Sequence, residues 1–322
     1  MSELLKSIDA RTKLAGTNKL EILLFSLGED RRTGRRETYG INVFKVREVM
    51  RTPPITAAPD MPPAVEGMVS LRGMLVPVVD LARYAGVDSD VPREIMIVTE
   101  YNGHTQGFLV EAVDTILRLD WSMMRVPPDM LMAQMGGLVT AVTELEDGRL
   151  IMMMDVEKVL ADTANTDEDD IRFKSIVPLD NPEVTVFFCD DSIVARKQIE
   201  RTLEAMGVKY VAANNGRQMW EELEKMAGYA KAMGKSPADL VSLVLTDIEM
   251  PEMDGYILTK KLKNDARFAS VPVIMHSSLS GMSNQKLGLS VGVDEYVPKF
   301  EPQRLSETLT RRLTERLPAT TN

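Results

Sequence analysis

The spacing of hydrophobic and polar positions changes between the two halves of the chain. Before about residue 162, short apolar runs are separated by turn-forming residues, a pattern typical of an all-β barrel or sandwich. After about residue 183, apolar runs of strand length alternate with longer segments that carry helical spacing. The chain therefore predicts an all-β domain followed by an α/β domain.

The first half predicts several strands and few helices. Its expected strands are 20–27, 39–43, 74–79, 95–99, 105–110 and 150–154, and its expected helical pieces are 4–15, 46–50 and 156–160. Apolar residues near one stripe of 4–15 suggest that this segment docks on a partner or on its own domain.

The second half predicts five strand–helix units. The expected strands are 184–189, 209–213, 240–246, 271–276 and 294–297, and helices are expected at 192–206, from 218, at 256–264 and at 302–317. Such alternation predicts a doubly wound, five-stranded parallel sheet with helices on both faces. Segment 226–239 is long for a connection, so we expect it to extend the second helix or to form a surface loop.

A polar stretch at 162–170 has no apolar periodicity and begins a linker. The predicted organisation is a helical segment at 1–17, an all-β domain at 18–162, a linker at 163–182 and an α/β domain at 183–318.

Composition narrows the possible functions of the 322 residues. A net charge of −10 without a basic cluster argues against a nucleic-acid partner. The single cysteine, Cys189, cannot form an internal disulfide. There is no apolar run long enough to span a membrane and no signal-peptide pattern, so we expect a cytoplasmic protein without membrane insertion.

Polar residues stand where the predicted strands of the second half end. In a parallel sheet these ends share one edge, so the side chains should converge there. Three carboxylates that lie close together repel one another, and Mg²⁺ is a hard cation that would compensate them. The residues are Asp190 and Asp191 after the first strand, Asp247 after the third, Ser277 after the fourth and Lys299 after the fifth.

This set of side chains suits phosphoryl transfer to Asp247. A carboxylate is an established nucleophile for phosphoryl groups, and catalysis of the transfer is mostly positioning and electrostatics. Lys299 can supply positive charge, and the Ser277 hydroxyl can donate to a phosphoryl oxygen. Other interpretations are a helix-capping role for Asp190, a solvent-facing hydroxyl for Ser277 and a packing role for His276.

Residues 183–317 resemble the response-regulator receiver family. The resemblance rests on Asp190-Asp191, the Asp-x-x-Met-Pro-x-Met-Asp-Gly run from Asp247, and Lys299. It implies that Asp247 is the phosphoacceptor and that Asp191, Asp247 and the backbone carbonyl of Glu249 bind Mg²⁺, with Asp190 helping through water. It also implies that Ser277 and Tyr296 are the switch residues.

The sequence departs from the receiver family after Lys299. Family members usually have Lys-Pro with a cis bond, whereas Phe300 follows Lys299 here. A cis bond before a residue other than proline costs about 2.5–4 kcal/mol, so we expect a trans bond.

The first half carries no phosphate loop, catalytic triad or metal-spaced cluster, which indicates a binding module. A turn at Arg72-Gly73 precedes a buried strand, and Pro77 places that strand at an edge or a bulge. The run Leu-Arg-Gly-x-x-x-Pro-Val-Val-Asp-Leu makes 18–162 resemble the CheW family. That resemblance implies two five-stranded β-barrels that bind the histidine kinase CheA and the cytoplasmic tips of chemoreceptors, with Arg72 as a partner-binding residue or a simple turn residue. The charged segment 29–37 is expected to be a solvated hairpin loop.

A CheW-like domain followed by a receiver resembles the CheV family of chemotaxis proteins. The resemblance implies a scaffold in two-component signal transduction, recruited to membrane-associated receptor arrays, whose coupling of receptors to CheA is modulated when Asp247 is phosphorylated. It implies no enzyme beyond Mg²⁺-dependent self-phosphotransfer and autodephosphorylation at Asp247. The alternative is a phosphate sink that drains CheA. A DNA-binding regulator and a histidine kinase are disfavoured, because no effector domain, ATP-binding glycine pattern or phosphorylatable histidine context is visible.

Overall fold

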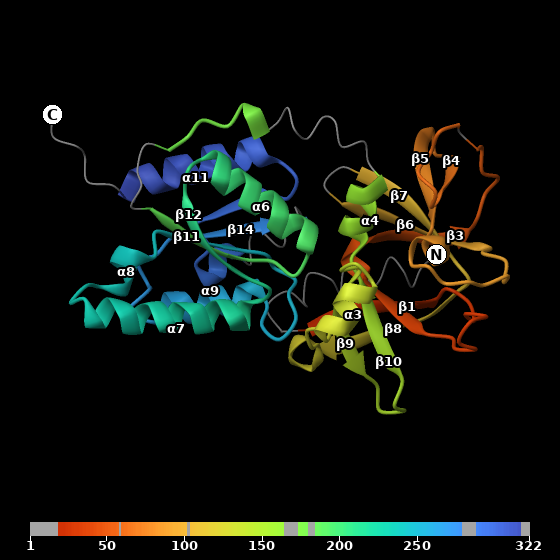
Figure 1. Ribbon diagram of the computed structural model, residues 1–322, viewed down its shortest axis with the longest axis horizontal. Coiled ribbons are helices and arrows are strands. Elements are labelled where there is room, and N and C mark those ends of the chain that lie inside the picture. The colour runs from red at the N-terminus through yellow and green to blue at the C-terminus, as the bar shows by residue number, and fades with distance from the viewer. Residues whose placement is uncertain are drawn as a thin grey trace. The chain divides into compact units, whose positions relative to one another are not determined.

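The computed structural model describes residues 19–57, 59–101, 104–163, 173–179, 184–278 and 288–316 (Figure 1). The chain divides into two compact units, Leu20–Ala164 and a second unit from Asn165 onward. Within the described residues, no helix combines the length and the apolar character needed to cross a membrane. Each unit is described by itself.

The first sheet of the first unit has the strand order β8-β1-β2-β10-β9 and closes on itself. After β8 and a short 3₁₀ turn (Trp121–Met123), the backbone of Arg125 pairs with Val142 of β9 through two N–H···O bonds of 2.9 Å. This bridge joins the two edges, which turns the sheet into a barrel. The strands are β8 (Ala112–Asp120), β1 (Lys19–Ser26), β2 (Thr38–Asn42), β10 (Leu150–Met154) and β9 (Val139–Glu144).

The second sheet, ordered β3-β6-β7-β5-β4, closes in the same way. Thr56, in the segment after β3, exchanges two backbone hydrogen bonds of 2.9 Å with Met68 of β4. A Cβ on the neighbouring Gly67 would lie 2.2 Å from the Thr56 carbonyl oxygen, so this close approach requires glycine. The strands are β3 (Val46–Arg51), β6 (Ile95–Tyr101), β7 (His104–Val110), β5 (Met74–Asp80) and β4 (Val65–Leu71).

Three apolar clusters hold the barrels together, and the largest lies between the two sheets. There, Phe25 and Ile41 of the first sheet belong to the same cluster as Phe108 of the second. Trp121 and Ile151 belong to the core of the first barrel, and Val76 to that of the second. The prediction of an all-β, double-barrel domain is confirmed.

One local prediction for this unit was wrong, and for another only one of its two alternatives is excluded. Residues 46–50, expected as a helix, form most of β3, because Val49 and its neighbours pair with β6 after a 3₁₀ turn at Val43–Lys45. Of the two alternatives for the strand that carries Pro77, the edge is excluded, since β5 lies between β7 and β4, whereas the β4–β5 register does shift beside it, opposite Val78 and Val79. Pro77 is tolerated there because the ladder to β7 begins one residue later, at Val78.

The second unit contains a parallel sheet ordered β12-β11-β13-β14-β15, which confirms the doubly wound prediction. Strand β13 is central: it pairs in parallel with β11 on one side and with β14 on the other, and β12 and β15 form the edges. The strands are β11 (Thr185–Cys189), β12 (Lys209–Ala213), β13 (Leu243–Thr246), β14 (Val273–Ser277) and β15 (Glu295–Pro298).

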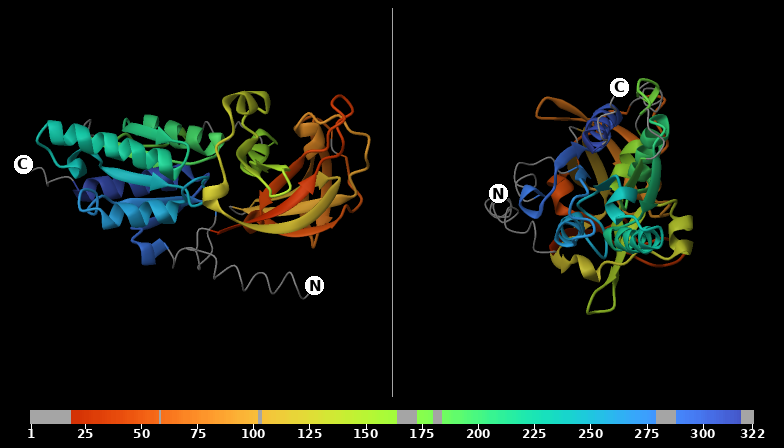
Figure 2. Two further views of the ribbon diagram at one scale, coloured as in Figure 1. Left: turned by 90° about the horizontal axis from the view of Figure 1, so that it is seen from below. Right: turned by 90° about the vertical axis from the view of Figure 1, so that its left-hand side faces the viewer.

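Helices cover both faces of this sheet (Figures 1 and 2). Helices α6 (Ile193–Ala205) and α11 (Pro302–Arg316) share one apolar cluster with β11, and α7 (Gly216–Ala232) and α9 (Gly255–Asn264) share the other. The long segment at 226–239 extends α7 to Ala232 and then forms α8 (Pro237–Leu240). Of the two alternatives for that segment, extension of the helix is therefore the one observed.

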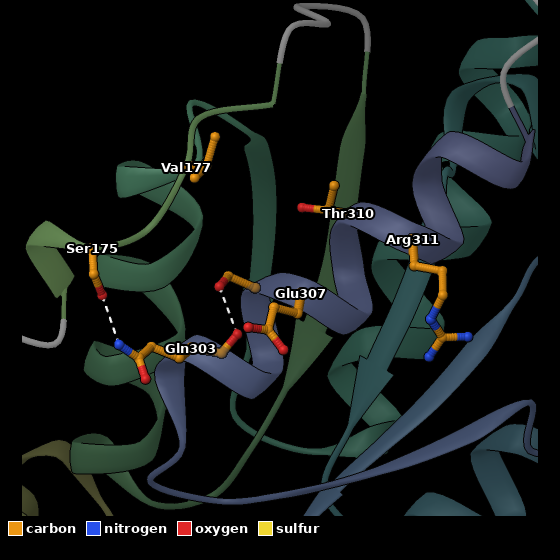
Figure 3. A pocket seen from close by; sticks show the side chains of 7 residues that line it. Ser175, Val177, Gln303, Glu307, Thr310 and Arg311 are labelled. Carbon is orange, nitrogen blue, oxygen red and sulfur yellow. Dashed lines mark hydrogen bonds between the residues drawn. The ribbon is translucent and has the colours of Figure 1, made fainter.

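Part of the expected linker packs onto this unit. The side chains of Phe173 and Ile176 are buried in the same cluster as α6 and α11, and the Arg201 guanidinium lies 4.2 Å from the Phe173 ring centroid. We call residues 173–179 the arm. Ser175 of the arm accepts a 2.7 Å hydrogen bond from Gln303 of α11, beside a cavity of about 520 Å³ (Figure 3). The α/β unit therefore includes residues before 183.

Candidate functional site

The parallel sheet of the second unit brings its acidic residues together at one edge. Asp190 and Asp191 follow β11, and Asp247 follows β13, so all three lie beyond the carboxyl ends of neighbouring strands. One carboxylate oxygen from each residue lies within 4.8 Å of those of the other two. We call these three residues the acidic pocket.

Lys299 neutralises part of the acidic pocket. Its Nζ lies 2.9 Å from Asp190 Oδ2 and 2.9 Å from Asp247 Oδ2, and its side chain is 2% exposed. Lys299 reaches this position because it follows β15, whose pairing with β14 places it at the same edge of the sheet. A buried ammonium between two buried carboxylates is stable only as a unit, because removal of one partner leaves a desolvated charge.

Backbone donors hold the other oxygens of two carboxylates. Asp247 Oδ1 accepts from the Ile248 N–H at 2.7 Å, and Asp190 Oδ1 accepts from the Ser192 N–H at 3.0 Å. Ser192 in turn caps α6, since its Oγ accepts from the Ala195 N–H. The residue that caps α6 is therefore Ser192 and not Asp190, whose carboxylate lies in the acidic pocket and holds the N–H of the capping residue.

Arg196 is a supporting residue that the sequence analysis missed. Its guanidinium donates to the backbone carbonyls of Asp190 at 2.6 Å and Asp191 at 2.9 Å. These bonds tie the first turn of α6 to the loop that presents both carboxylates. A basic residue one helical turn beyond the Asp-Asp pair is a signal that could have identified it.

The turn after Asp247 is built around a close backbone contact. A Cβ on Gly255 would lie 2.0 Å from the Asp247 carbonyl oxygen, so only glycine fits. Asp254 starts α9 by accepting from the Ile257 N–H at 2.7 Å. Glu249 lies within this turn, two residues after Asp247.

The acidic pocket fits a divalent cation. Its three carboxylates offer hard oxygen ligands at mutual distances that one ion can span, and the single ammonium of Lys299 balances only one of the three negative charges. Mg²⁺ takes a few carboxylate oxygens and retains waters, which matches this donor set. Asp190, Asp191 and Asp247 would hold the ion.

Two residues expected to act as switches lie near the same edge. Ser277 is buried at the end of β14. Tyr296, on β15, has its hydroxyl 3.0 Å from the hydroxyl of Tyr256, which the sequence analysis did not identify. Burial raises the pKa of both phenols well above the usual range, so both are neutral at neutral pH.

The loop after Lys299 departs from an ordinary backbone conformation. No cis peptide bond occurs among the described residues, so the Lys299–Phe300 bond is trans, as expected. Phe300 then adopts a left-handed conformation with φ of 62°. For a residue with a Cβ this costs about 1–2 kcal/mol, which the surrounding contacts must offset.

Arg72 belongs to the first unit, whereas the acidic pocket belongs to the second. It forms the two-residue β4–β5 hairpin loop with Gly73, and both have positive φ, 52° and 84°, as a type I′ turn requires. Its side chain is 69% exposed and lies 2.9 Å from Glu48. The charged segment 29–37 is also largely exposed, although Arg31 forms ion pairs with the loop at Asp88 and Asp90.

Comparison with known proteins finds relatives of both units. Residues 21–164 match the CheW-like domain, and residues 186–310 match the response regulator receiver domain. The chain is 31% identical to "Chemotaxis protein CheV3" of Helicobacter pylori, over 85% of this chain and 88% of that protein. It is 26% identical to "Chemotaxis protein CheV1" of the same species, over 96% of this chain and 98% of that protein. Among solved structures, the scaffolding protein TtCheW from Thermoanaerobacter tengcongensis covers 42% of this chain and 84% of its own, with 28% identity and a TM-score of 0.38.

Proposed function

The chain belongs to the CheV family of chemotaxis coupling proteins, and from this premise we propose that it links chemoreceptors to the histidine kinase CheA under the control of phosphorylation at Asp247. The proposal is supported by the acidic pocket, in which Lys299 bridges two carboxylates. The other unit of the same chain matches the CheW-like domain. The CheW-like unit supplies the contacts with receptor and kinase, and the receiver unit accepts the phosphoryl group.

Asp247 is the nucleophile in this proposal. A carboxylate oxygen attacks the phosphorus of a phosphohistidine on CheA; the P–O bond forms as the P–N bond breaks, and the leaving imidazole keeps the electron pair and takes up a proton. Bound Mg²⁺ would neutralise charge on the transferring group. The residues of the chain do the positioning: Ile248 N–H holds one Asp247 oxygen, and Lys299 lies beside the other.

Phosphorylation changes the partners of Lys299. In the structure this ammonium is shared between Asp190 and Asp247. A phosphoryl group on Asp247 adds charge and strong acceptor oxygens, so Lys299 moves its hydrogen bonds to them, and the Ser277 hydroxyl donates to another. The rearrangement passes to Tyr296 and alters how the CheW-like unit engages its partners. Hydrolysis of the acyl phosphate within the same pocket ends the signal.

Asp247→Asn tests the phosphoacceptor assignment. With radiolabelled phospho-CheA and Mg²⁺, the wild-type protein should become labelled and the variant should not, while receptor binding stays unchanged. Asp239→Asn is the matched control, because Asp239 is an exposed carboxylate outside the pocket whose bond to the Ser236 N–H an amide can keep. Labelling of the Asp247 variant at the wild-type level would refute the assignment.

A second experiment separates control of coupling from simple drainage of phosphoryl groups. Receptor-stimulated CheA activity is measured with this protein as the sole coupling protein, before and after Asp247 carries beryllofluoride, an analogue of a phosphoryl group. Control by phosphorylation predicts a change in coupling. Equal coupling in both states would replace this proposal with a phosphate sink.

Arg72→Ala tests the binding surface. The side chain is exposed at a tight turn, so its loss should weaken binding of the receptor or kinase without unfolding the barrel. Arg149→Ala is the control, since this arginine is also exposed and forms ion pairs with acidic neighbours. Unchanged affinity for both partners would leave Arg72 as a turn residue only.

A further inference from the structure

We propose that Thr246 is a positioning residue for the phosphoacceptor, because its hydroxyl fixes the peptide group whose N–H holds the Asp247 carboxylate. The inference deepens the proposed function and rests on it only for its effect on phosphoryl transfer. Thr246 is 0% exposed at the end of β13, and its Oγ1 donates to the Asp247 carbonyl oxygen at 2.9 Å. The hydroxyl therefore acts on the carboxylate through the backbone.

The peptide group between Asp247 and Ile248 is held at both ends. Its carbonyl accepts the hydrogen bond from Thr246, and its N–H donates to Asp247 Oδ1 at 2.7 Å. Because a peptide group is planar, the direction of the carbonyl also sets the direction of the N–H. With Oδ1 held in this way, Oδ2 is the oxygen that lies 2.9 Å from Lys299 Nζ.

Cys189 holds the Thr246 hydroxyl in turn. The two residues are paired directly across β11 and β13, and Cys189 Sγ lies 3.3 Å from Thr246 Oγ1. A hydroxyl has one proton to give and the Asp247 carbonyl can only accept, so that proton goes to the carbonyl and the thiol donates to the hydroxyl. Burial raises the pKa of the Cys189 thiol, which therefore keeps its proton at neutral pH.

The packing around the hydroxyl is tight and apolar. A Cβ on Gly255 would lie 3.1 Å from Thr246 Oγ1, and Cys189 belongs to the apolar cluster that α7 and α9 cover. A buried hydroxyl in such surroundings needs hydrogen-bond partners, and here it has both a donor and an acceptor. The residues that directly precede Asp190 and Asp247 are thus tied to each other across the two strands that present these acids.

Loss of the hydroxyl should weaken the hold on the Asp247 carboxylate. The carbonyl would lose its donor, so the peptide group could turn and the Ile248 N–H would point at Oδ1 for less of the time. The net contribution of one such hydrogen bond corresponds to roughly a 2- to 12-fold change in an equilibrium. Because Thr246 is buried, the affinity for CheA should not change.

Thr246→Val tests the contact in the full chain without metal or phosphate, since it replaces the hydroxyl by a methyl group of similar shape. Cys189 is the only cysteine, so the protein has one S–H infrared band, which should move to higher wavenumber when the thiol loses its acceptor. In protein labelled with ¹⁵N-isoleucine, the Ile248 amide is identified by its absence in Ile248→Val. Its hydrogen exchange should become roughly 2- to 12-fold faster in Thr246→Val.

Two variants serve as controls. Thr246→Ser keeps the hydroxyl, so both signals should stay near wild type. Thr202→Val removes another fully buried hydroxyl of the same unit, which donates to the Gln198 carbonyl at 2.8 Å, and it should change neither signal. Equal urea midpoints of the two valine variants would show that the change is not general loosening.

An unchanged S–H band and unchanged Ile248 exchange in Thr246→Val would overturn the inference. If Thr246→Val does not fold, Thr246→Ser decides alone: wild-type signals in the serine variant support the role of the hydroxyl, and loss of both signals overturns it.

A second arm measures the reaction, with radiolabelled phospho-CheA and Mg²⁺. The maximal rate of labelling should fall roughly 2- to 12-fold in Thr246→Val, at an unchanged half-saturating concentration of CheA, and should stay near wild type in both controls. A wild-type rate in Thr246→Val would overturn the positioning role. If the wild-type protein is not labelled but the metal-free differences are present, the Thr246 contact stands and the phosphoacceptor assignment fails.

Discussion

Lys299→Met should destabilise the receiver unit strongly, and Mg²⁺ should relieve much of the loss. The Lys299 side chain is 2% exposed, and its Nζ lies 2.9 Å from carboxylate oxygens of both Asp190 and Asp247. Methionine has a similar length and removes the charge, so two buried carboxylates then face each other without a cation. Breaking a buried ion pair by removing one partner costs about 3–5 kcal/mol.

The same geometry predicts how the loss of unfolding free energy in Lys299→Met depends on the Mg²⁺ concentration. A divalent cation held by Asp190, Asp191 and Asp247 would supply the missing positive charge. The loss of unfolding free energy should therefore be largest in EDTA and should shrink when Mg²⁺ is added, whereas wild type gains less from the ion. Binding to the folded state alone adds roughly 2.7 kcal/mol when Mg²⁺ is a hundredfold above its dissociation constant.

Urea unfolding followed by Trp220 fluorescence measures the effect in the receiver unit. A Trp121→Phe background, used for every variant, removes the second of the two tryptophans. Lys225→Met is the control: this lysine is 71% exposed and pairs with Glu222, so the expected cost is below about 1 kcal/mol. A loss from Lys299→Met as small as that control, or a loss that Mg²⁺ does not change, would refute the electrostatic account of the pocket.

Three further predictions concern other contacts. Arg196→Gln should weaken Mg²⁺ binding about 10- to 100-fold in calorimetry, because the loop of Asp190 and Asp191 loses the guanidinium that holds its carbonyls; unchanged affinity would contradict this. Ile176→Ala should lower the free energy of unfolding of the receiver unit in urea by about 2–5 kcal/mol, since Ile176 is 8% exposed. Val177 is 76% exposed, so Val177→Ala should change this free energy by less than about 0.5 kcal/mol. Equal effects of the two substitutions would show that the arm is not docked. Burial raises the pKa of Tyr39 to about 12, so the folded state favours the neutral phenol. The stability that this phenol contributes should be complete below pH 10 and lost between about pH 10 and 12. In Tyr39→Phe, the free energy of unfolding of the barrel unit should therefore depend less on pH over that window.

The order of strands and helices in the receiver unit was predictable from the sequence, whereas the state of short segments whose pattern suits both a helix and a strand was not. The strands and helices of the receiver unit were predicted because apolar runs and amphipathic segments alternate there over long stretches. By contrast, 46–50 has apolar positions that suit a helix as well as a strand. The pairing of β3 with β6 decides between them, and that partner lies about fifty residues away in the chain.

The arm and Pro77 show the same limit. Residues 173–179 contain only a few apolar side chains between polar neighbours, so the sequence offered no sign that Phe173 and Ile176 would find a cluster on α6 and α11. Pro77 correctly indicated a missing donor. The residue without an N–H can lie on an edge strand or just before the first pair of a central ladder. Strand register decides between the two positions, and residue propensity does not encode register.

By itself the sequence determined which chemistry is available. Asp190, Asp191, Asp247, Ser277 and Lys299 could be named because polar residues at the ends of apolar strands must meet at one edge of a parallel sheet. The tertiary structure decided which of them touch and what supports them. Lys299 bridges two of the acids, Arg196 holds their loop, and Tyr256 reaches Tyr296, because such contacts depend on side-chain direction and on distances of a few ångströms, which the order of residues does not specify.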